Sequence, residues 1–147
     1  MAGAQRTATA VWEGNLTEGQ GRVKPASGAF PEVRVTWEAR TGGDDRTTSP
    51  EELIAAAHAA CFSMALSNGL AKAGHAPERL EVTATCSFDP KPEGGFRIGS
   101  MKINVHGKVP GVDEAGFRDA ARAAGEGCPV SGALKGNVEV SVEAALD

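Results

Sequence analysis

The sequence contains little cysteine, no excess of basic residues and no obvious membrane-spanning run. Its 147 residues include 15 Lys and Arg against 19 Asp and Glu, so the formal net charge is −4. Binding to nucleic acid needs clustered basic side chains that neutralise phosphates, so this charge argues against such a partner. By inspection no run reaches the roughly 18 apolar residues of a membrane span, and the N-terminal segment lacks a signal-peptide core. We therefore expect a cytoplasmic protein with no nucleic-acid or membrane partner.

The three cysteines, Cys61, Cys86 and Cys128, form no C-x-x-C motif and no Cys/His cluster at metal-ligand spacing. We therefore expect neither a structural zinc nor another metal or cofactor. An odd number of cysteines in a reducing compartment also argues against a structural disulfide framework. The remaining question is whether one of these thiols is chemically reactive.

The first half of the chain alternates like a sheet and then changes to helical periodicity. Residues 7–14, 21–25 and 32–38 predict three strands. Ser49 as a cap, Pro50 at the first position and Glu52 in a capping box predict a helix of roughly 24 residues that stops at Gly74. Its apolar stripe is expected to consist of Leu53, Ala57, Ala60, Cys61 and Met64.

The second half predicts two strands, two helices and a last strand. The strands are expected over residues 79–89 and 96–109, with a bulge near Gly99, and over 137–146. One helix should follow a cap at Asp113, and a short one should start at Cys128 and Pro129. The order βββαββααβ predicts a single α+β domain over residues 1–147, and not a doubly wound parallel sheet.

Local sequence alone favours an inert role for Cys61. It lies about eleven residues inside the helix, beyond the terminal dipole, so burial would raise its pKa unless another element supplies a cation. A small apolar core residue is the commoner outcome. His58, one turn earlier, is placed to form a thiol–imidazole pair, although a histidine satisfied at a packed surface is the favoured interpretation.

The other two cysteines and two of the arginines lie in local environments that favour different roles. Cys128 is equally consistent with a buried loop residue and with a thiolate favoured by the start of a short helix. Cys86, on the core face of a strand, is interpreted as structural. Arg40 is expected to end the third strand on the approach to the long helix and is the candidate cation, whereas Arg46 lies in a Gly/Asp loop and is expected to be solvated.

Two long motifs carry a family resemblance. The segments TSPEELIAAAHAACFSMALS and GCPVSGALK strongly resemble the OsmC/Ohr family of organic hydroperoxide peroxidases, and AAHAACFSMALS is closer to the OsmC branch. The similarity covers nearly the whole chain, including the N-terminal WEG. It implies antiparallel sheets around a long central helix, in an intertwined homodimer with active sites at the subunit interface.

The resemblance also implies roles for four residues. The peroxidatic cysteine corresponds to Cys61 and the resolving cysteine to Cys128. Glu51 follows the proline of a T-N-P-E-like motif, in which this chain has Ser49 where Asn is usual. Arg40 ends an aromatic-x-x-Arg pattern that begins at Trp37.

A mechanism follows from these roles. Arg40 would favour the Cys61 thiolate, which attacks a hydroperoxide and becomes a sulfenic acid. Cys128 would then form a disulfide with Cys61. An external dithiol, such as a lipoylated protein, would restore the thiols. Glu51 lies about 15 Å from Cys61 along one helix, so we expect any glutamate that orients Arg40 at the site to come from the other subunit.

Two other classes of protein are kept open. One is a redox-responsive or small-ligand-binding protein on the same fold, and the other is a structural α+β module with inert thiols. For the enzyme, an apolar wall from Phe62, Met64 or Phe88 would favour alkyl or aryl hydroperoxides, because burying carbon is worth about 25 cal/mol per Å².

Overall fold

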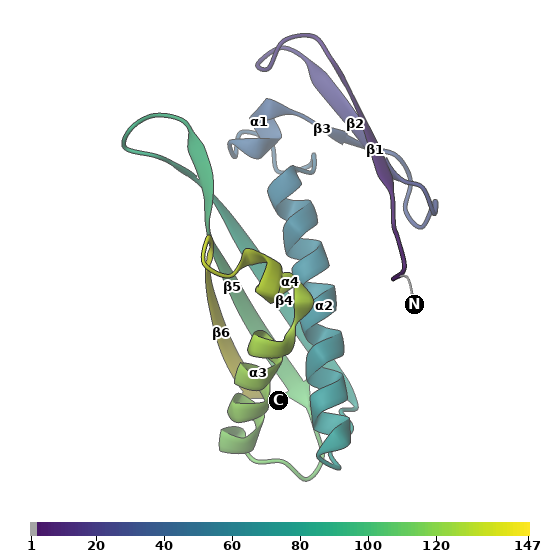
Figure 1. Ribbon diagram of the computed structural model, residues 1–147, viewed down its shortest axis with the longest axis vertical. Helices are drawn as coiled ribbons and strands as arrows, with labels where there is room; N and C mark the ends of the chain where they lie inside the picture. The colour runs from purple at the N-terminus through teal and green to yellow at the C-terminus, as the bar shows by residue number, and fades with distance from the viewer. Residues whose placement is uncertain (1–2) are drawn as a thin grey trace. The chain divides into compact units, whose positions relative to one another are not determined.

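The chain folds into two compact units, Met1–Leu53 and Ile54–Asp147, in a computed structural model that describes residues 3–147 (Figure 1). Each unit contains its own three-stranded sheet. The α+β class predicted from the sequence is confirmed. The single domain over residues 1–147 stays a prediction, and the two units are described in turn.

The sheet of the first unit contains β1 (Ala8–Glu13), β2 (Gln20–Pro25) and β3 (Val33–Val35), antiparallel and in that order. Gly21 on β2 lies opposite Trp12 on β1 and Val35 on β3. A Cβ at Gly21 would lie 2.7 Å from the Trp12 ring and 2.8 Å from a Val35 methyl. Glycine therefore lets two bulky side chains meet across the middle strand.

The predicted third strand, 32–38, is too long. The strand ends at Val35, and Trp37–Arg40 forms the short helix α1 instead. Thr36 caps this helix, because its Oγ1 accepts a hydrogen bond from the Ala39 N–H at 3.1 Å. Local capping thus overrides the alternating pattern and moves Trp37 and Arg40 from a strand to a helical turn.

Helix α2 (Pro50–Lys72) begins in the first unit and continues into the second. The predicted cap is confirmed, since Ser49 Oγ accepts from the Glu52 N–H at 3.1 Å. Glu52 does not complete the expected capping box with Ser49: its carboxylate accepts from the Thr48 hydroxyl at 2.6 Å. Gly74 has a φ of 89°, the left-handed conformation expected of the stop.

The predicted buried stripe of α2 is wrong. Ala57 and Ala60 are exposed, and Met64 is 73% exposed. The buried positions lie on another face and are Glu51, Ala55, His58, Phe62, Leu66 and Leu70. Apolar residues surround most of this helix, so their spacing did not identify the face that packs. The exposed apolar face of α2 is therefore available for a further contact.

In length and composition α2 also qualifies as a helix able to cross a membrane, contrary to the estimate from inspection. About 22% of this apolar window is buried within the protein, and Phe62 and Leu66 are fully buried. The cytoplasmic location stays a prediction.

The sheet of the second unit contains β4 (Arg79–Pro90), β5 (Phe96–Lys108) and β6 (Glu139–Leu146), in that order. The predicted bulge is confirmed, because Cys86 pairs with Met101 and Phe88 with Ile98, so β5 carries one extra residue beside Gly99. The β4–β5 pair is antiparallel, whereas β6 joins β5 in parallel. The parallel pair arises because helices connect these two strands.

Those helices are α3 (Glu114–Gly127) and α4 (Pro129–Leu134). Asp113 caps α3 as predicted, with Oδ1 accepting from the Gly116 N–H at 2.7 Å. Figure 1 shows α2 running along the sheet of this unit with α3 beside it. The core is made of side chains from α2, β5 and α3, namely Phe62, Leu66, Leu70, Met101, Ile103, Val105, Phe117 and Ala121.

Candidate active site

The second unit brings two of the predicted site residues into contact. Cys61 on α2 and Cys128 between α3 and α4 are 67 residues apart in sequence, and their Sγ atoms lie 3.0 Å apart. Cys128 is 1% exposed and Cys61 is half-buried. Both are thiols, and a disulfide bond would require the sulfurs to move closer by about 1 Å.

Local sequence explains the position of Cys128. Its N–H bonds to the Ala124 carbonyl at 2.8 Å and ends α3, and its carbonyl accepts from Gly132 in α4 at 3.0 Å. Pro129 holds the preceding residue in an extended conformation, here with φ −71° and ψ 122°. Cys128 therefore connects α3 to α4, and its side chain lies at the start of α4.

The two thiols differ in their tendency to ionise. Burial, and then the hydrogen bond with Cys128, raise the pKa of Cys61. Burial also opposes ionisation of Cys128, but hydrogen bonds with Cys61 and with the backbone and side chain of Ser131 lower its pKa overall. In the neutral pair Cys128 donates to Cys61.

His58 does not bond to Cys61 in the way that a thiol–imidazole pair requires. It is fully buried, and its Nε2 lies 2.7 Å from the Oγ of Ser131 on α4. Burial lowers the pKa of His58, which favours the neutral ring. Its other nitrogen, Nδ1, is buried and has no partner within residues 3–147. Ser131 was missed from sequence, although its place three residues after Cys128, in the first turn of α4, was a usable signal.

The first unit brings together the other two predicted residues. Arg40, at the end of α1, donates from Nε to Glu51 Oε1 at 3.0 Å, and its Nη2 lies 3.0 Å from the same oxygen. The Glu51 side chain is 6% exposed and that of Arg40 is 34% exposed. Glu51 Oε2 is buried without a hydrogen-bond partner in the described part of the chain. The pair therefore offers a partly open cation held by a buried carboxylate.

This contact corrects one expectation. The glutamate that binds Arg40 was expected from the other subunit, but Glu51 of the same chain makes the contact. The reason is that α1 turns the chain back before α2 begins, which a straight strand to Arg40 would not do. Arg46, 93% exposed, is solvated as predicted.

The remaining candidates have simpler environments. Cys86 is half-buried and packs against the core from β4, as expected of a structural residue. Within residues 3–147, no group of three or more His, Cys, Asp or Glu side chains is arranged to hold a metal ion.

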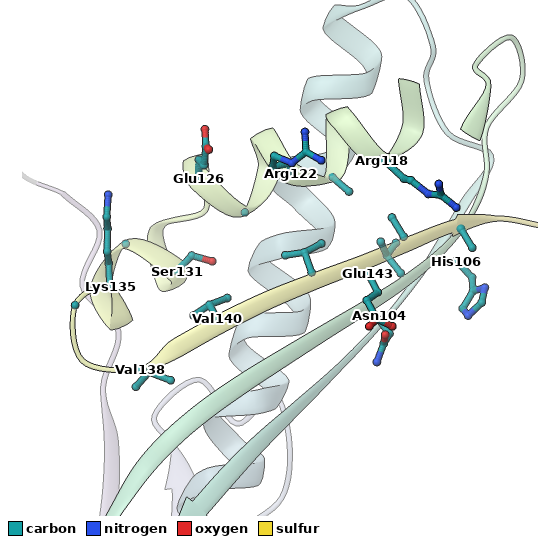
Figure 2. A pocket seen from close by; sticks show the side chains of 18 residues that line it. Asn104, His106, Arg118, Arg122, Glu126, Ser131, Lys135, Val138, Val140 and Glu143 are labelled. Atoms are coloured by element: carbon teal, nitrogen blue, oxygen red, sulfur yellow. The ribbon is translucent and has the colours of Figure 1, made fainter. Parts of the chain in front are cut away.

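A groove of about 900 Å³ lies between β6 and the helices α3 and α4 (Figure 2). Ser131 lies at its edge, so the groove reaches the residue that contacts Cys128. The predicted apolar wall is not found as a unit: Phe62 is fully buried, Met64 is mostly exposed and Phe88 stacks on Phe96 with centroids 4.7 Å apart. The groove instead has valines on β6 and charged side chains on α3.

Comparison with known proteins places this arrangement in a family. Residues 41–143, which include Glu51 and both thiols of the contact, match the model of the OsmC-like proteins. The chain belongs to the OsmC-like family. It is 40% identical over 134 residues to the peroxiredoxin OsmC of Escherichia coli, covering 91% of this chain and 92% of that protein. It is 36% identical to the organic hydroperoxide resistance protein of Xanthomonas axonopodis, covering 71% and 70% of the two chains.

Solved structures agree with the fold. The organic hydroperoxide resistance protein OhrB of Bacillus subtilis superposes with a TM-score of 0.74 at 29% identity, covering 95% of this chain and 98% of that one. An OsmC organic hydroperoxide resistance protein from Legionella pneumophila superposes with a TM-score of 0.77 at 27% identity, covering 97% and 99%. The OsmC-like fold predicted from the sequence is therefore confirmed.

Proposed function

We propose that this protein is a thiol-dependent peroxidase that reduces organic hydroperoxides to alcohols. The observation that carries the proposal is the 3.0 Å contact between Cys61 and Cys128. The names of the relatives, a peroxiredoxin and organic hydroperoxide resistance proteins, support the same class of reaction. The partly open position of Cys61, against the burial of Cys128, makes Cys61 the thiol that meets the peroxide.

The first step is attack of the Cys61 thiolate on one peroxide oxygen. A sulfur–oxygen bond forms, the oxygen–oxygen bond breaks, and the alkoxide leaves and takes a proton to become the alcohol. Cys61 is oxidised by two electrons to a sulfenic acid, and the hydroperoxide is reduced. Because burial raises the pKa of the Cys61 thiol, this step needs a cation that stabilises both the thiolate and the departing alkoxide. Arg40, held by Glu51, is the proposed source.

In the second step the Cys128 sulfur attacks the Cys61 sulfur, and the sulfenic oxygen leaves as water. Because the two Sγ atoms lie 3.0 Å apart in the reduced protein, they need to move closer by only about 1 Å to form the disulfide. An external dithiol, for which a lipoyl group has the required chemistry, then reduces the disulfide by exchange.

The working unit is proposed to be a homodimer. Ten residues of α2 separate Glu51 from Cys61, a rise of about 15 Å along the helix. The Arg40–Glu51 pair of one chain is therefore proposed to serve Cys61 of its partner. The exposed apolar face of α2, which includes Met64, is a surface that a second copy would cover.

Turnover of an organic hydroperoxide under excess dithiol tests the function. Wild type and Cys86→Ser should consume many equivalents of tert-butyl hydroperoxide. Cys61→Ser should consume none, and Cys128→Ser should accumulate a sulfenic acid that dimedone traps. The competing function, a redox-responsive or ligand-binding protein, predicts at most one equivalent consumed. Full turnover by Cys61→Ser would overturn the proposed nucleophile.

A further inference from the structure

His58 and Ser131 form a buried polar link that the proposed reaction does not yet use. His58 comes from α2, which carries Cys61, and Ser131 comes from α4, which Cys128 precedes. Their hydrogen bond of 2.7 Å joins residues 73 positions apart, with His58 fully buried and Ser131 7% exposed. A polar group removed from water costs free energy unless it is paired, and here His58 Nε2 and Ser131 Oγ pair with each other.

The environment of His58 indicates which nitrogen carries the proton. Burial favours the neutral ring, so only one nitrogen has an N–H. Nδ1 is buried with no partner among the described residues, whereas Nε2 faces Ser131 Oγ. A proton on Nε2 leaves only an acceptor lone pair unpaired, while a proton on Nδ1 would bury an unpaired donor. Nε2–H therefore donates to Ser131 Oγ.

This assignment directs the hydroxyl of Ser131. Since Oγ accepts from His58, its own proton is available to another acceptor. Ser131 is three residues after Cys128, and side chains at this spacing at a helix start lie on the same side. Hydrogen bonding from Ser131 is among the contributions that favour the Cys128 thiolate.

We propose that His58 and Ser131 are positioning residues for the resolving step: His58 Nε2–H fixes Ser131 Oγ, and the Ser131 hydroxyl donates to Cys128 Sγ as this sulfur becomes a thiolate. The proposal rests on the proposed peroxidase function for its role in turnover. The thiolate forms a sulfur–sulfur bond to the oxidised Cys61, and the sulfur–oxygen bond of the sulfenic acid breaks. Hydroxide leaves and takes the proton lost by Cys128, giving water. Cys128 is oxidised, Cys61 is reduced, and no further reactant is needed.

The first experiment compares Ser131→Thr with Ser131→Val. These side chains have nearly the same shape, and only threonine keeps a hydroxyl. Ser131 borders the groove, which gives the added methyl groups room. After one equivalent of tert-butyl hydroperoxide, Ser131→Val should convert the Cys61 sulfenic acid to the disulfide about tenfold more slowly than wild type, because a hydrogen bond to a charged sulfur is lost. Ser131→Thr should restore most of the rate, and sulfenic acid formation should be unchanged in both.

The same logic applies to the histidine. His58→Gln keeps an N–H donor near the position of Nε2, and His58→Leu removes it. We expect slow disulfide formation in His58→Leu and partial rescue in His58→Gln. His106→Gln, at an exposed position of β5, and Ser63→Ala, at a half-buried position of α2, are the matched controls and should behave as wild type.

The redox potential of the Cys61–Cys128 couple is a second readout that needs no peroxide. Equilibration with dithiothreitol buffers measures it, at a pH at which Cys128 of the wild type is ionised. Loss of the Ser131 hydroxyl destabilises the reduced form, so Ser131→Val should shift the equilibrium constant about tenfold, or about 30 mV more negative. This shift is expected even if peroxidase turnover fails. Equal potentials and equal rates for Ser131→Val, Ser131→Thr and wild type would overturn the proposal.

Discussion

The two units of the chain hold different chemical groups, and the proposed mechanism uses both. The first unit holds a partly open guanidinium on a buried carboxylate, Arg40 on Glu51, and the second holds two thiols in contact, a buried Cys128 and a half-buried Cys61. Burial, and then the hydrogen bond with Cys128, raise the pKa of Cys61, whereas hydrogen bonds lower the pKa of Cys128 despite its burial. In the proposed mechanism the contact between the thiols prepares them to form a disulfide, whereas reaction with a peroxide would use the charge of Arg40.

Removing that charge should have the largest effect. Arg40→Met is expected to lower kcat/KM for an organic hydroperoxide by about 100- to 1,000-fold, because the thiolate and the departing alkoxide both lose their counter-charge. Steady-state hydroperoxide consumption measures this. Arg46→Met, in the exposed loop, is the matched control and should stay within about twofold of wild type. A fully active Arg40→Met protein would contradict the proposal that Arg40 of the first unit supplies the charge for the reaction of Cys61.

Changing the carboxylate should have a smaller effect. Glu51→Gln keeps the shape of the side chain but removes the charge that holds Arg40. We expect kcat/KM to fall about tenfold, which corresponds to the free energy of roughly one charge-assisted hydrogen bond. Single-turnover rates of Cys61 oxidation locate the loss in the first step. A loss confined to disulfide formation would contradict the assignment of Glu51 to the charge of the first unit.

The second unit should respond to acid through His58. Burial lowers its pKa in the folded state below the ordinary value of 6.5, so the unfolded chain binds more protons. This part of the stability is complete above about pH 6.5 and is lost as pH falls through the interval between the unfolded and folded pKa values. Measured by urea unfolding, the free energy of unfolding should fall more steeply below pH 6.5 in the wild type than in His58→Gln. The same pH dependence of the free energy of unfolding in both proteins would contradict this role of His58.

The smallest effect concerns the helix that both units share. Ser49→Ala removes the cap of α2 and should lower the free energy of unfolding by about 1 kcal/mol. Thermal unfolding measures the change. Ser63→Ala, whose hydroxyl donates to the Ala60 carbonyl on the helix surface, should change stability by no more than about 0.5 kcal/mol. Equal values for the two variants would show that the cap has no role in fixing the start of α2.

Much of the fold could be predicted because its signals are local. Caps at Ser49 and Asp113, the stop at Gly74 and the bulge beside Gly99 each depend on a few neighbouring residues. The face on which α2 packs could not be predicted, because alanines surround the helix and leave no clear stripe. Helix α1 was missed because the capping of Thr36 competes with an alternating pattern that continues to Trp37.

The candidate site, like the fold, has parts that could be predicted from the sequence and parts that could not. Motifs identified Cys61, Cys128, Arg40 and Glu51 through resemblance, and the structure pairs them as thiol with thiol and cation with carboxylate. The resemblance also implied that Cys61 and Cys128 would meet, but local sequence alone could not pair two thiols that lie 67 positions apart. The link from His58 to Ser131 was beyond it too, because a tertiary contact between α2 and α4 leaves no periodic signal.

Mixing two inactive variants tests most directly whether the Arg40 and the Cys61 that act together come from different chains. Cys61→Ser chains keep Arg40, and Arg40→Met chains keep both thiols, so a mixed dimer has one complete site only if Arg40 serves the partner. After subunit exchange of equal amounts, about a quarter of the wild-type hydroperoxide turnover should return, since half of the dimers are mixed and each has one of two sites. Absence of recovery, with mixed dimers demonstrated by mass spectrometry, would contradict the account.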